Sequence, residues 1–425
     1  MPIVIELDVA APWQPPASPV RPRLRRWLTV PLALVAVLAL VGGSAPGRPL
    51  APAFTLDGAV LDFLARGDSL YLARYAEPRG TLVEAYRFPG GQLRWSWVLE
   101  PGVRLVHASE SRLTVADDDA AGSGPVLAGL DTENGLAVWS RPGYERVAVT
   151  DAVVLAAPPH AGSGAVPELV AFASDDGVVR WSAQVPPGTR AGGPPDIGFA
   201  PVVGSGVAVV LADGTVQVRD VDSGDLRWNV KVDVTWPVRG LLVVGDVAIL
   251  YPVPQPEPAA PVAVDLGSGR VLWRAEPTAR LGPCADALCD LAGSGTRAVD
   301  PRTGLHLWRQ TDWHLAGTLD ERHIVVTAGD PVDASTAAPA GVLDARTGRR
   351  VREFGSWRVL GSAPGLAIVQ HLHSDGTSLI AKVDVETGSR TVVGVWESWL
   401  PAPRCRSTAV FVACAGTARV AVWAR

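Results

Sequence analysis

The sequence has few charged residues, and almost none of its cations are lysine. Only 19% of the residues are Asp, Glu, Lys or Arg, and Lys occurs at just two positions, Lys231 and Lys382. The formal net charge is -5, and the first 26 residues carry four Arg against Glu6 and Asp8, so the remainder stands near -7. We therefore expect no basic face for nucleic acid, which excludes DNA and RNA as partners.

The composition also lacks the signs of a helical or disordered chain. Gly 44, Pro 37 and a hydrophobic share of 48% suit many short strands joined by turns. A length of 425 residues fits two or three average domains, but it also fits one propeller, because propellers grow by repetition. The composition predicts an all-β protein.

Long hydrophobic runs are scarce, and only one is free of charge. It extends from Trp27 to Gly43, about 17 residues, at the short end of the ~17 to 25 that span a bilayer. The stretch before it is rich in Pro and cannot bury enough apolar surface to fold. We expect a disordered tail over residues 1–26, a transmembrane helix over 27–44 and a linker over 45–53.

The charges around this run predict its orientation. Four Arg precede it and only Arg48 follows closely, which places the N-terminus in the cytoplasm and everything after about residue 45 outside. A cleaved signal peptide is the alternative. An uncleaved anchor is preferred, because the run starts far from the N-terminus and Pro46 follows the small residues that a peptidase would need. The sequence thus predicts a single-pass protein of the cell membrane.

Cysteine is rare, and its four copies fall into two close pairs. Cys284 lies five positions before Cys289, and Cys405 lies nine before Cys414. Both spacings suit a hairpin, and thiols outside the membrane tend to oxidise. We expect two local disulfides, since the other connectivities would join sites over a hundred residues apart. Neither spacing is that of a zinc site.

One pattern recurs along the chain with a period of about 35 to 47 residues. The clear copies are Ala85–Trp95 (AYRFPGGQLRW), Gly129–Trp139 (GLDTENGLAVW), Ala171–Trp181 (AFASDDGVVRW), Val218–Trp228 (VRDVDSGDLRW), Ala263–Trp273 (AVDLGSGRVLW) and Ala298–Trp308 (AVDPRTGLHLW). Two degenerate copies, Val342–Arg352 and Lys382–Val392, keep Asp and Thr-Gly but lack the Trp, for which Trp357 or Trp396 can substitute. Such a period predicts a propeller or an array.

Each residue of the pattern has a physical reason to recur in a tight hairpin. The carboxylate of Asp accepts hydrogen bonds from the turn N–H groups, as in an Asx-turn, and is expected at Asp131, Asp220, Asp265, Asp300, Asp344 and Asp384. Gly adopts positive φ where the turn passes into a bulge, and is expected at Gly91, Gly135, Gly177, Gly224, Gly269, Gly304, Gly348 and Gly388. Trp ends the returning strand and covers the seam with the next blade, as expected at Trp139, Trp181, Trp228, Trp273 and Trp308. An aromatic ligand cage is the rival interpretation of these rings.

Eight turn glycines predict a propeller of eight blades over residues 54–425, with seven as the alternative. The period would place a ninth turn near residue 430, beyond the last residue. Two further strands, Thr408–Cys414 and Arg419–Trp423, need a partner. We expect them to pair with N-terminal strands around Phe54–Leu72 or to belong to the Gly388 blade.

At these turns the chain resembles the quinoprotein-like family of pyrroloquinoline-quinone-like repeat propellers. The resemblance implies a propeller over roughly residues 54–425, and it covers both quinone-dependent dehydrogenases and non-catalytic scaffolds such as outer-membrane assembly factors. The dehydrogenases use a Ca²⁺ held by Glu and Asn, a base Asp and adjacent cysteines. This chain has no Cys-Cys pair and only two Asn, Asn134 in a turn and Asn229 beside a repeat Trp. We therefore predict a non-catalytic member, not an enzyme, with no cofactor.

The remaining candidate sites are local. Asp117, Asp118 and Asp119 precede Gly122 and could bind a cation, but they lack alternating ligand spacing, so a solvated loop is preferred. His371 and His373 share a strand face without an evident third ligand, so no metal site is predicted.

The sequence thus favours a membrane-anchored extracytoplasmic propeller that binds a protein partner through loops at one mouth. A sensor or binder of a small ligand or cell-wall glycan is the alternative, and a quinone-dependent dehydrogenase is the third hypothesis.

Overall fold

The structure is a computed structural model, and the residues that it describes begin at residue 51. The described residues are 51–76, 80–117, 125–158, 168–184, 190–191, 202–203, 206–211, 215–232, 238–252, 260–277, 279–291, 295–328, 340–363, 365–373, 377–397 and 403–424. They belong to one compact unit, Pro49–Arg425. The expected tail (1–26), transmembrane helix (27–44) and most of the linker (45–53) lie outside the described residues. Within the described part, no helix has the length and apolar character needed to cross a bilayer.

All regular elements of the described chain are β-strands, arranged in nine antiparallel sheets. The first three sheets contain β2 (Asp62–Arg66), β3 (Ser69–Ala76), β4 (Gly80–Arg87) and β5 (Gln92–Leu99); β6 (Arg104–Ala108), β7 (Arg112–Asp117), β8 (Val126–Asp131) and β9 (Ala137–Pro142); and β10 (Glu145–Val149), β11 (Val153–Ala157), β12 (Glu168–Ala173) and β13 (Val179–Gln184). The next three contain β14 (Arg190–Ala191), β15 (Val202–Val203), β16 (Gly206–Val210), β17 (Thr215–Asp220) and β18 (Leu226–Lys231); β19 (Val238–Val244), β20 (Val247–Pro252), β21 (Val262–Asp265) and β22 (Val271–Arg274); and β23 (Leu281–Cys284), β24 (Ala287–Asp290), β25 (Thr296–Val299) and β26 (His306–Gln310). The last three contain β27 (Trp313–Thr318), β28 (His323–Ala328), β29 (Ala340–Asp344) and β30 (Arg350–Gly355); β31 (Arg358–Ala363), β32 (Leu366–Leu372), β33 (Thr377–Asp384) and β34 (Arg390–Glu397); and β35 (Arg404–Ser407), β36 (Phe411–Ala415), β37 (Arg419–Ala424) and β1 (Phe54–Asp57).

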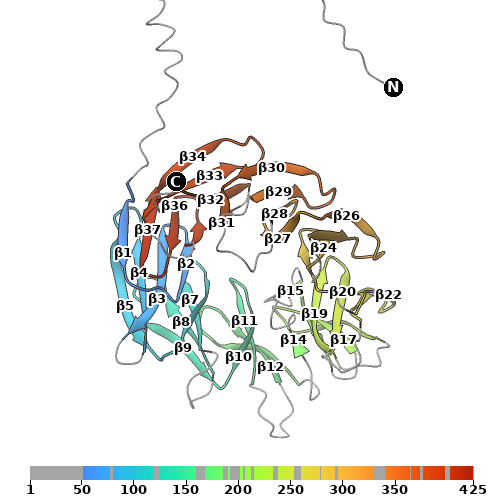
Figure 1. The fold of residues 1–425 in the computed structure, drawn as a ribbon. Helices are drawn as coiled ribbons and strands as arrows, with labels where there is room; N and C mark the ends of the chain where they lie inside the picture. Colours follow the sequence, from blue (N-terminus) through green and yellow to red (C-terminus); the bar gives the residue numbers. More distant parts are fainter. Residues whose placement is uncertain are drawn as a thin grey trace, which may run out of the picture. The chain divides into compact units, whose positions relative to one another are not determined.

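The sheets follow one another around a ring, as the blades of a propeller do (Figure 1). In each blade the chain runs from an innermost strand, such as β2, β27 or β31, to an outermost strand, such as β5, β26 or β34. Because successive strands are antiparallel, their connections alternate between two sides of the ring. We call the side with the Asp-Gly turns the turn side, and the side with the links between successive blades the loop side.

The number of blades corrects the expectation from the sequence, because the structure has nine blades where eight, or alternatively seven, were predicted. The ninth blade is built from both ends of the propeller: β35, β36 and β37 come from the C-terminal end and β1 from the N-terminal end. Phe54 pairs with Val422, and Asp57 with Arg419. This blade has no Asp-Gly turn, since its outermost strand arrives from elsewhere in the chain, and a count of turns therefore misses it.

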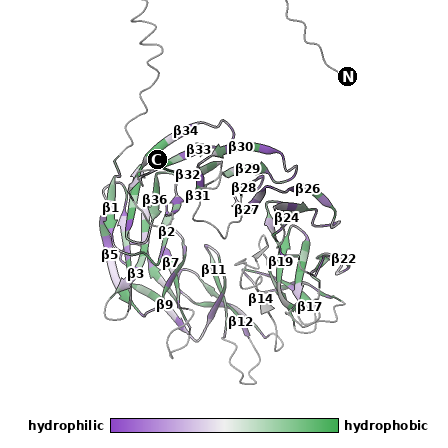
Figure 2. Cartoon of the chain, in the orientation of Figure 1, coloured by the Kyte–Doolittle hydropathy of each residue, from purple (hydrophilic) through white to green (hydrophobic). Residues whose placement is uncertain are grey.

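The hydrophobic core consists of nine clusters, one in each seam between neighbouring blades. In the seam between the second and third blades, Leu127 and Trp139 pack with Val154 and Phe172. The seam that closes the ring brings Phe63 of the first blade against Phe411 of the ninth. Hydropathy follows this pattern, with hydrophilic residues gathered on outer strands such as β26 and β30 (Figure 2). Since each seam is filled, the ring is held closed by the same kind of contact all the way round.

Candidate functional site

The recurring Asp residues organise the turns on the turn side. Asp131 Oδ1 accepts the backbone N–H groups of Glu133 at 2.8 Å and Asn134 at 3.2 Å. The corresponding carboxylates of Asp220, Asp265, Asp300, Asp344 and Asp384 accept turn N–H groups in the same way. The backbone N–H of Ser223 and the Arg227 guanidinium hold the pKa of Asp220 at about 2. These carboxylates are thus engaged in local structure, as an Asx-turn requires.

Burial and hydrogen bonding act in opposite directions on Asp344. Burial by itself raises the pKa of this carboxyl, but hydrogen bonds from Thr347 and Arg322 outweigh it and hold the pKa at about 2. Arg322 Nε lies 2.9 Å from Asp344 Oδ2. The carboxylate is therefore ionised and paired in the folded protein.

Most of the recurring Trp residues dock on the turn of the following blade. Trp139 Nε1 donates to the Ser174 carbonyl at 2.9 Å, and a Cβ placed on Gly177 would lie 2.5 Å from the Trp139 ring. Trp95, Trp181, Trp273 and Trp308 make the same bond to Thr132, Val221, Pro301 and Ala345. The nearest atoms to the ideal Cβ positions of Gly135, Gly224, Gly304 and Gly348 likewise belong to Trp rings. These turns require Gly for two reasons: the residue has positive φ, and a Cβ would overlap the Trp ring.

Three turns are covered by other side chains. Val230 stands closest to Gly269 instead of the expected Trp228. Arg352, at the Trp position of a degenerate copy, lies against Gly388 and donates from Nε to the Val385 carbonyl at 3.3 Å.

The third exception lies at the ring closure. Phe54 of β1 covers Gly91, the turn glycine of the first blade. Trp357 and Trp396, which the sequence offered as substitutes for the missing Trp residues, pack in the seams on either side of the eighth blade instead.

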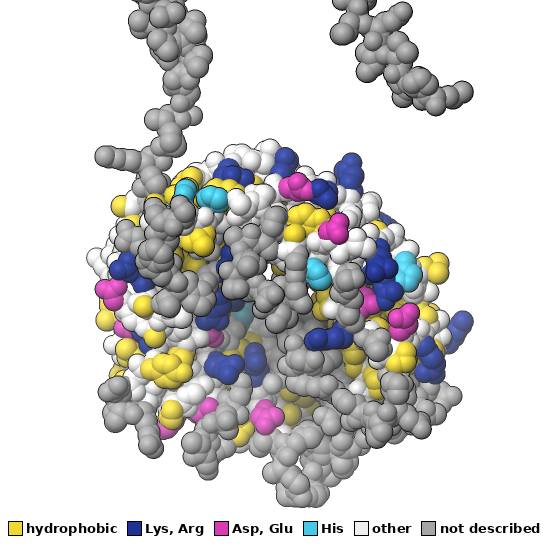
Figure 3. Space-filling view, viewed as in Figure 1, with side chains coloured by type: hydrophobic (Ala, Val, Ile, Leu, Met, Phe, Trp, Pro, Cys, Tyr) yellow, Lys and Arg dark blue, Asp and Glu magenta, His cyan; other side chains and the backbone are white. Residues whose placement is uncertain are grey.

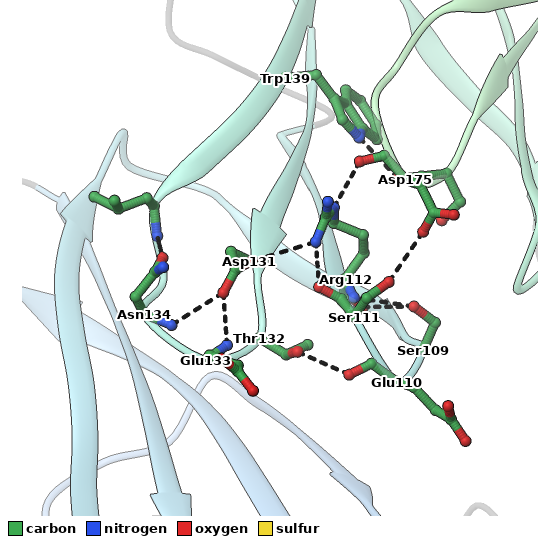
Figure 4. Close-up of polar contacts among 12 residues, drawn as sticks. Ser109, Glu110, Ser111, Arg112, Asp131, Thr132, Glu133, Asn134, Trp139 and Asp175 are labelled. Atoms are coloured by element: carbon green, nitrogen blue, oxygen red, sulfur yellow. Dashed lines mark hydrogen bonds and ion pairs between the residues drawn. The ribbon is translucent and has the colours of Figure 1, made fainter.

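A polar network joins the turns of the second and third blades (Figure 4). Arg112 donates from Nε to the Asp175 carbonyl at 2.6 Å and lies 3.3 Å from Asp131 Oδ2, and Ser111 Oγ donates to Asp175 Oδ1 at 3.0 Å. A comparable bridge joins Arg302 to Asp265 at 3.0 Å. The polar groups of the turn side are thus used to tie blades together, so a binding site is better sought elsewhere.

Both disulfides form as the sequence predicts. Cys284 lies at the end of β23 beside the turn, and Cys289 lies in β24, where it pairs with Gly282; their Cα atoms are 5.3 Å apart and both side chains are buried. Cys405 and Cys414 are register partners of β35 and β36, with Cα atoms 4.1 Å apart. Local pairing is confirmed, and no free cysteine is left among the four.

The two weaker candidates lie at strand ends in the eighth and second blades. The rings of His371 and His373 lie 5.0 Å apart, with His371 also 5.1 Å from Trp357 and Ser356 Oγ 3.1 Å from His371 Nδ1. Asp117 is buried at the end of β7, while Asp118 and Asp119 lie outside the described residues. No group of three or more His, Cys, Asp or Glu suited to a metal occurs in the described part of the chain.

The outer edge of the first blade is a feature that the repeat pattern did not reveal. Its outermost strand, β5, is eight residues long and exposes Leu93 by 51%, Trp97 by 44% and Val98 by 63%. Trp97 Nε1 donates to the Asn134 carbonyl at 3.1 Å, which fixes its ring beside Trp95 on the second blade's turn. The signal was present in the sequence as a second Trp two positions after the recurring one.

Comparison with known proteins gives the family. The family model described as outer membrane protein assembly factor BamB matches residues 78–288, from the first blade into the sixth. No curated protein sequence matches the chain.

Solved structures with similar folds are remote in sequence. BamB from Moraxella catarrhalis is 18% identical over 82% of this chain and 97% of that one, with a TM-score of 0.44. A eukaryotic initiation factor is 11% identical over 84% and 94%, with a TM-score of 0.53. A quinohemoprotein alcohol dehydrogenase from Pseudomonas putida HK5 is 12% identical over 89% and 78%, with a TM-score of 0.43. Together with the recurring Asp-Gly-Trp turns, the family match leads to one conclusion: the chain belongs to the pyrroloquinoline-quinone-like repeat family of β-propellers.

Proposed function

We propose that this protein is a membrane-anchored, extracytoplasmic propeller that acts as a protein-binding scaffold, with the outer edge of β5 as its binding surface. Two observations on β5 carry the proposal together: its outer edge has no partner strand among the described residues, and its apolar side chains are exposed. An unpaired strand edge offers a row of N–H and C=O groups that another chain can pair with. A partner that adds an extended strand there would satisfy these groups and bury the apolar side chains.

The side chains of β5 have the chemistry of a protein interface. Trp97 is anchored by its bond to the Asn134 carbonyl, so its exposed ring loses little conformational freedom on binding. Val98 pairs with Leu82 and Trp97 with Val83, so the two exposed residues point to opposite faces of the sheet. A strand added at this edge would contact both faces at once.

Other outermost strands are less complete as binding edges. β13 exposes Val179 by 50% and β18 exposes Leu226 by 44%, but neither strand has an exposed aromatic residue among its described residues. β34 is as long as β5, yet its Val393 and Trp396 are buried. The first blade is thus the preferred edge, and β13 supplies a matched control.

The placement outside the cell is proposed on two supports. The uncharged run after four Arg suits a single membrane anchor with the N-terminus inside. The two disulfides suit an oxidising compartment. We also propose a non-catalytic role, because all four cysteines are used in local disulfides and the Asn set of the quinone enzymes is missing.

Site-specific photo-crosslinking in intact membranes tests the binding surface. A photoreactive residue at Val98 of the full chain should form a discrete adduct with one partner, whereas the same residue at Val179 should not. Val98→Lys should abolish an adduct formed from position 97, because a charge at a strand edge opposes pairing, and Val179→Lys should leave it unchanged. Equal adducts at Val98 and Val179, or none at either, would refute the proposed surface.

The placement has a separate test. Protease added to intact cells cannot reach the cytoplasm, so it should digest the propeller only if the propeller lies outside. Protection until the membrane is broken would show that the propeller lies inside, whatever the crosslinking gives.

A further inference from the structure

The innermost strands of the propeller carry a concentration of positive charge that the repeat does not explain. Among the innermost-strand residues whose side chains the structure describes, there are six Arg and only two acidic residues, Asp62 and Glu145, a net charge of +4. The whole chain has a net charge of -5. The cations therefore gather around the central channel of an otherwise acidic protein.

These Arg residues recur at one place in the blade. Each innermost strand starts on the loop side, because the link from the preceding blade enters there. Among the strands with a described side chain at this place, Arg stands at the first or second position of four: Arg104, Arg146, Arg358 and Arg404. Arg406 follows on the same strand as Arg404. The topology thus brings cations from separate blades to the loop-side mouth of the channel, which we call the basic mouth.

The side chains that the structure describes at the basic mouth are accessible. Arg104, Arg146 and Arg406 are exposed, and no carboxylate of the described chain forms an ion pair with them. Arg404 is exposed and held in place: Nη2 lies 3.1 Å from the Leu61 carbonyl, Nη1 lies 4.0 Å from Asp62 Oδ1, and the guanidinium lies 5.9 Å from the Phe63 ring. Figure 3 shows several Lys and Arg side chains beside the central hollow, and others along the outer rim.

The opposite end of the channel differs. On the turn side, Arg66 lies 3.5 Å from Asp151 Oδ2, and His107 Nε2 lies 2.8 Å from Asp151 Oδ1. Asp151 thus pairs with the one Arg at this end of the described innermost strands, whereas the loop-side end has several Arg against the two carboxylates of Asp62 and Glu145. A cleft lined by one sign of charge focuses the field and attracts ligands of the opposite sign, so the loop-side mouth is the end that attracts anions.

The residues around these Arg side chains indicate which class of anionic ligand the basic mouth would bind. The aromatic side chains on the described innermost strands are buried, with Phe63 1% and Trp313 7% exposed, so they offer no stacking platform for bases or sugar rings. The innermost strands instead have backbone edges that face the channel without a partner strand in the described chain. Backbone groups beside guanidinium groups suit a polypeptide that carries carboxylates, because each Arg can form paired hydrogen bonds with a carboxylate.

From this placement we propose that the basic mouth binds an acidic, extended peptide segment of the partner protein. The inference rests on the proposed scaffold function and adds the chemistry of the partner. The partner would contact the propeller at two places, its acidic segment at the basic mouth and a strand at the edge of β5.

The test uses the full chain, purified in detergent, and fluorescence anisotropy of a labelled peptide of about twelve alternating Glu and Gly residues. Arg104→Gln combined with Arg146→Gln should weaken binding about tenfold, and adding salt should weaken the original protein's binding most. The matched control, Arg274→Gln with Arg309→Gln, removes two exposed cations from outermost strands β22 and β26 and should change affinity less than about twofold.

Several results would overturn the inference. Equal losses in the two double variants would show nonspecific attraction, and tighter binding of tripolyphosphate than of the peptide would show a compact phosphate ligand. Absence of saturable peptide binding would exclude the acidic segment, whereas adducts at Val98 would still support the scaffold function. Adducts missing at Val98 with intact peptide binding would instead refute the β5 surface alone.

Discussion

Docking of Trp139 on Gly177 can be isolated by comparing two Gly→Ala substitutions. Gly177 and Gly143 both have positive φ, +67° and +77°. A Cβ at Gly177 would meet the Trp139 ring at 2.5 Å, whereas a Cβ at Gly143 would meet nothing within 4 Å. Gly143→Ala therefore measures backbone strain alone, and Gly177→Ala measures strain plus displacement of the ring.

The expected magnitudes follow from these contacts. A left-handed non-Gly residue costs about 1 to 2 kcal/mol, which both variants share. Forcing the ring aside adds about 1 to 3 kcal/mol of overpacking. If the ring also gives up its bond to the Ser174 carbonyl, the buried carbonyl adds about 1 to 3 kcal/mol. Gly177→Ala should thus lower the free energy of unfolding by at least about 1 kcal/mol more than Gly143→Ala.

Urea unfolding followed by far-UV circular dichroism measures this difference. With a slope of about 3 kcal/mol/M, an additional loss of about 1 to 6 kcal/mol lowers the midpoint by a further ~0.3 to 2 M. In a Trp139→Val background the ring is gone, and Gly177→Ala should cost no more than Gly143→Ala. Equal midpoint shifts for the two Gly variants in the original protein would refute the docking argument.

Three further outcomes are expected. Replacing Cys405 and Cys414 together by Ser should lower the free energy of unfolding by about 2 to 3 kcal/mol, the loop-closure entropy of a short loop, as measured by urea unfolding with and without reductant. Asp344 has its pKa lowered to about 2, so its contribution is present above about pH 4 and is lost as pH falls through 2; Asp344→Asn should flatten that part of the stability profile by about 1 to 2 kcal/mol. Arg352→Ala should destabilise by about 1 to 2 kcal/mol because the Val385 carbonyl loses its donor, whereas Arg352→Trp should restore the docking seen in other blades and preserve the melting temperature.

The sequence was informative wherever a residue has a local task. Gly135 and Asp131 serve the same turn, four positions apart, and their roles depend on backbone geometry that repeats from blade to blade. The two disulfides were predictable for a similar reason, since each closes a hairpin. Interactions between residues close in the chain thus produce patterns that can be read from the sequence.

The ninth blade depends on a contact that has no local pattern. Phe54 and Gly91 are in contact because the ring closes, and no pattern in the sequence relates one residue to the other. The signal that could have revealed the blade was the pair of strands left over after the eighth turn. The basic mouth could not be predicted from the sequence for the same reason. Arg104 and Arg404 are about 300 residues apart, and only their equivalent positions in two blades relate them.

The shared ninth blade has a consequence for how the chain is made. β1 emerges from the ribosome first, but its partner β37 is synthesised some 360 residues later, an interval of about 20 to 70 s at ~5 to 20 residues per second. Throughout that time β1 has no strand to pair with, and the growing ring stays open. A premature stop before Arg419 would leave β1 and β36 both without their common neighbour. The six residues of β37 are therefore required to close the ring, and a chain that lacks them would expose unpaired strand edges to proteases and chaperones.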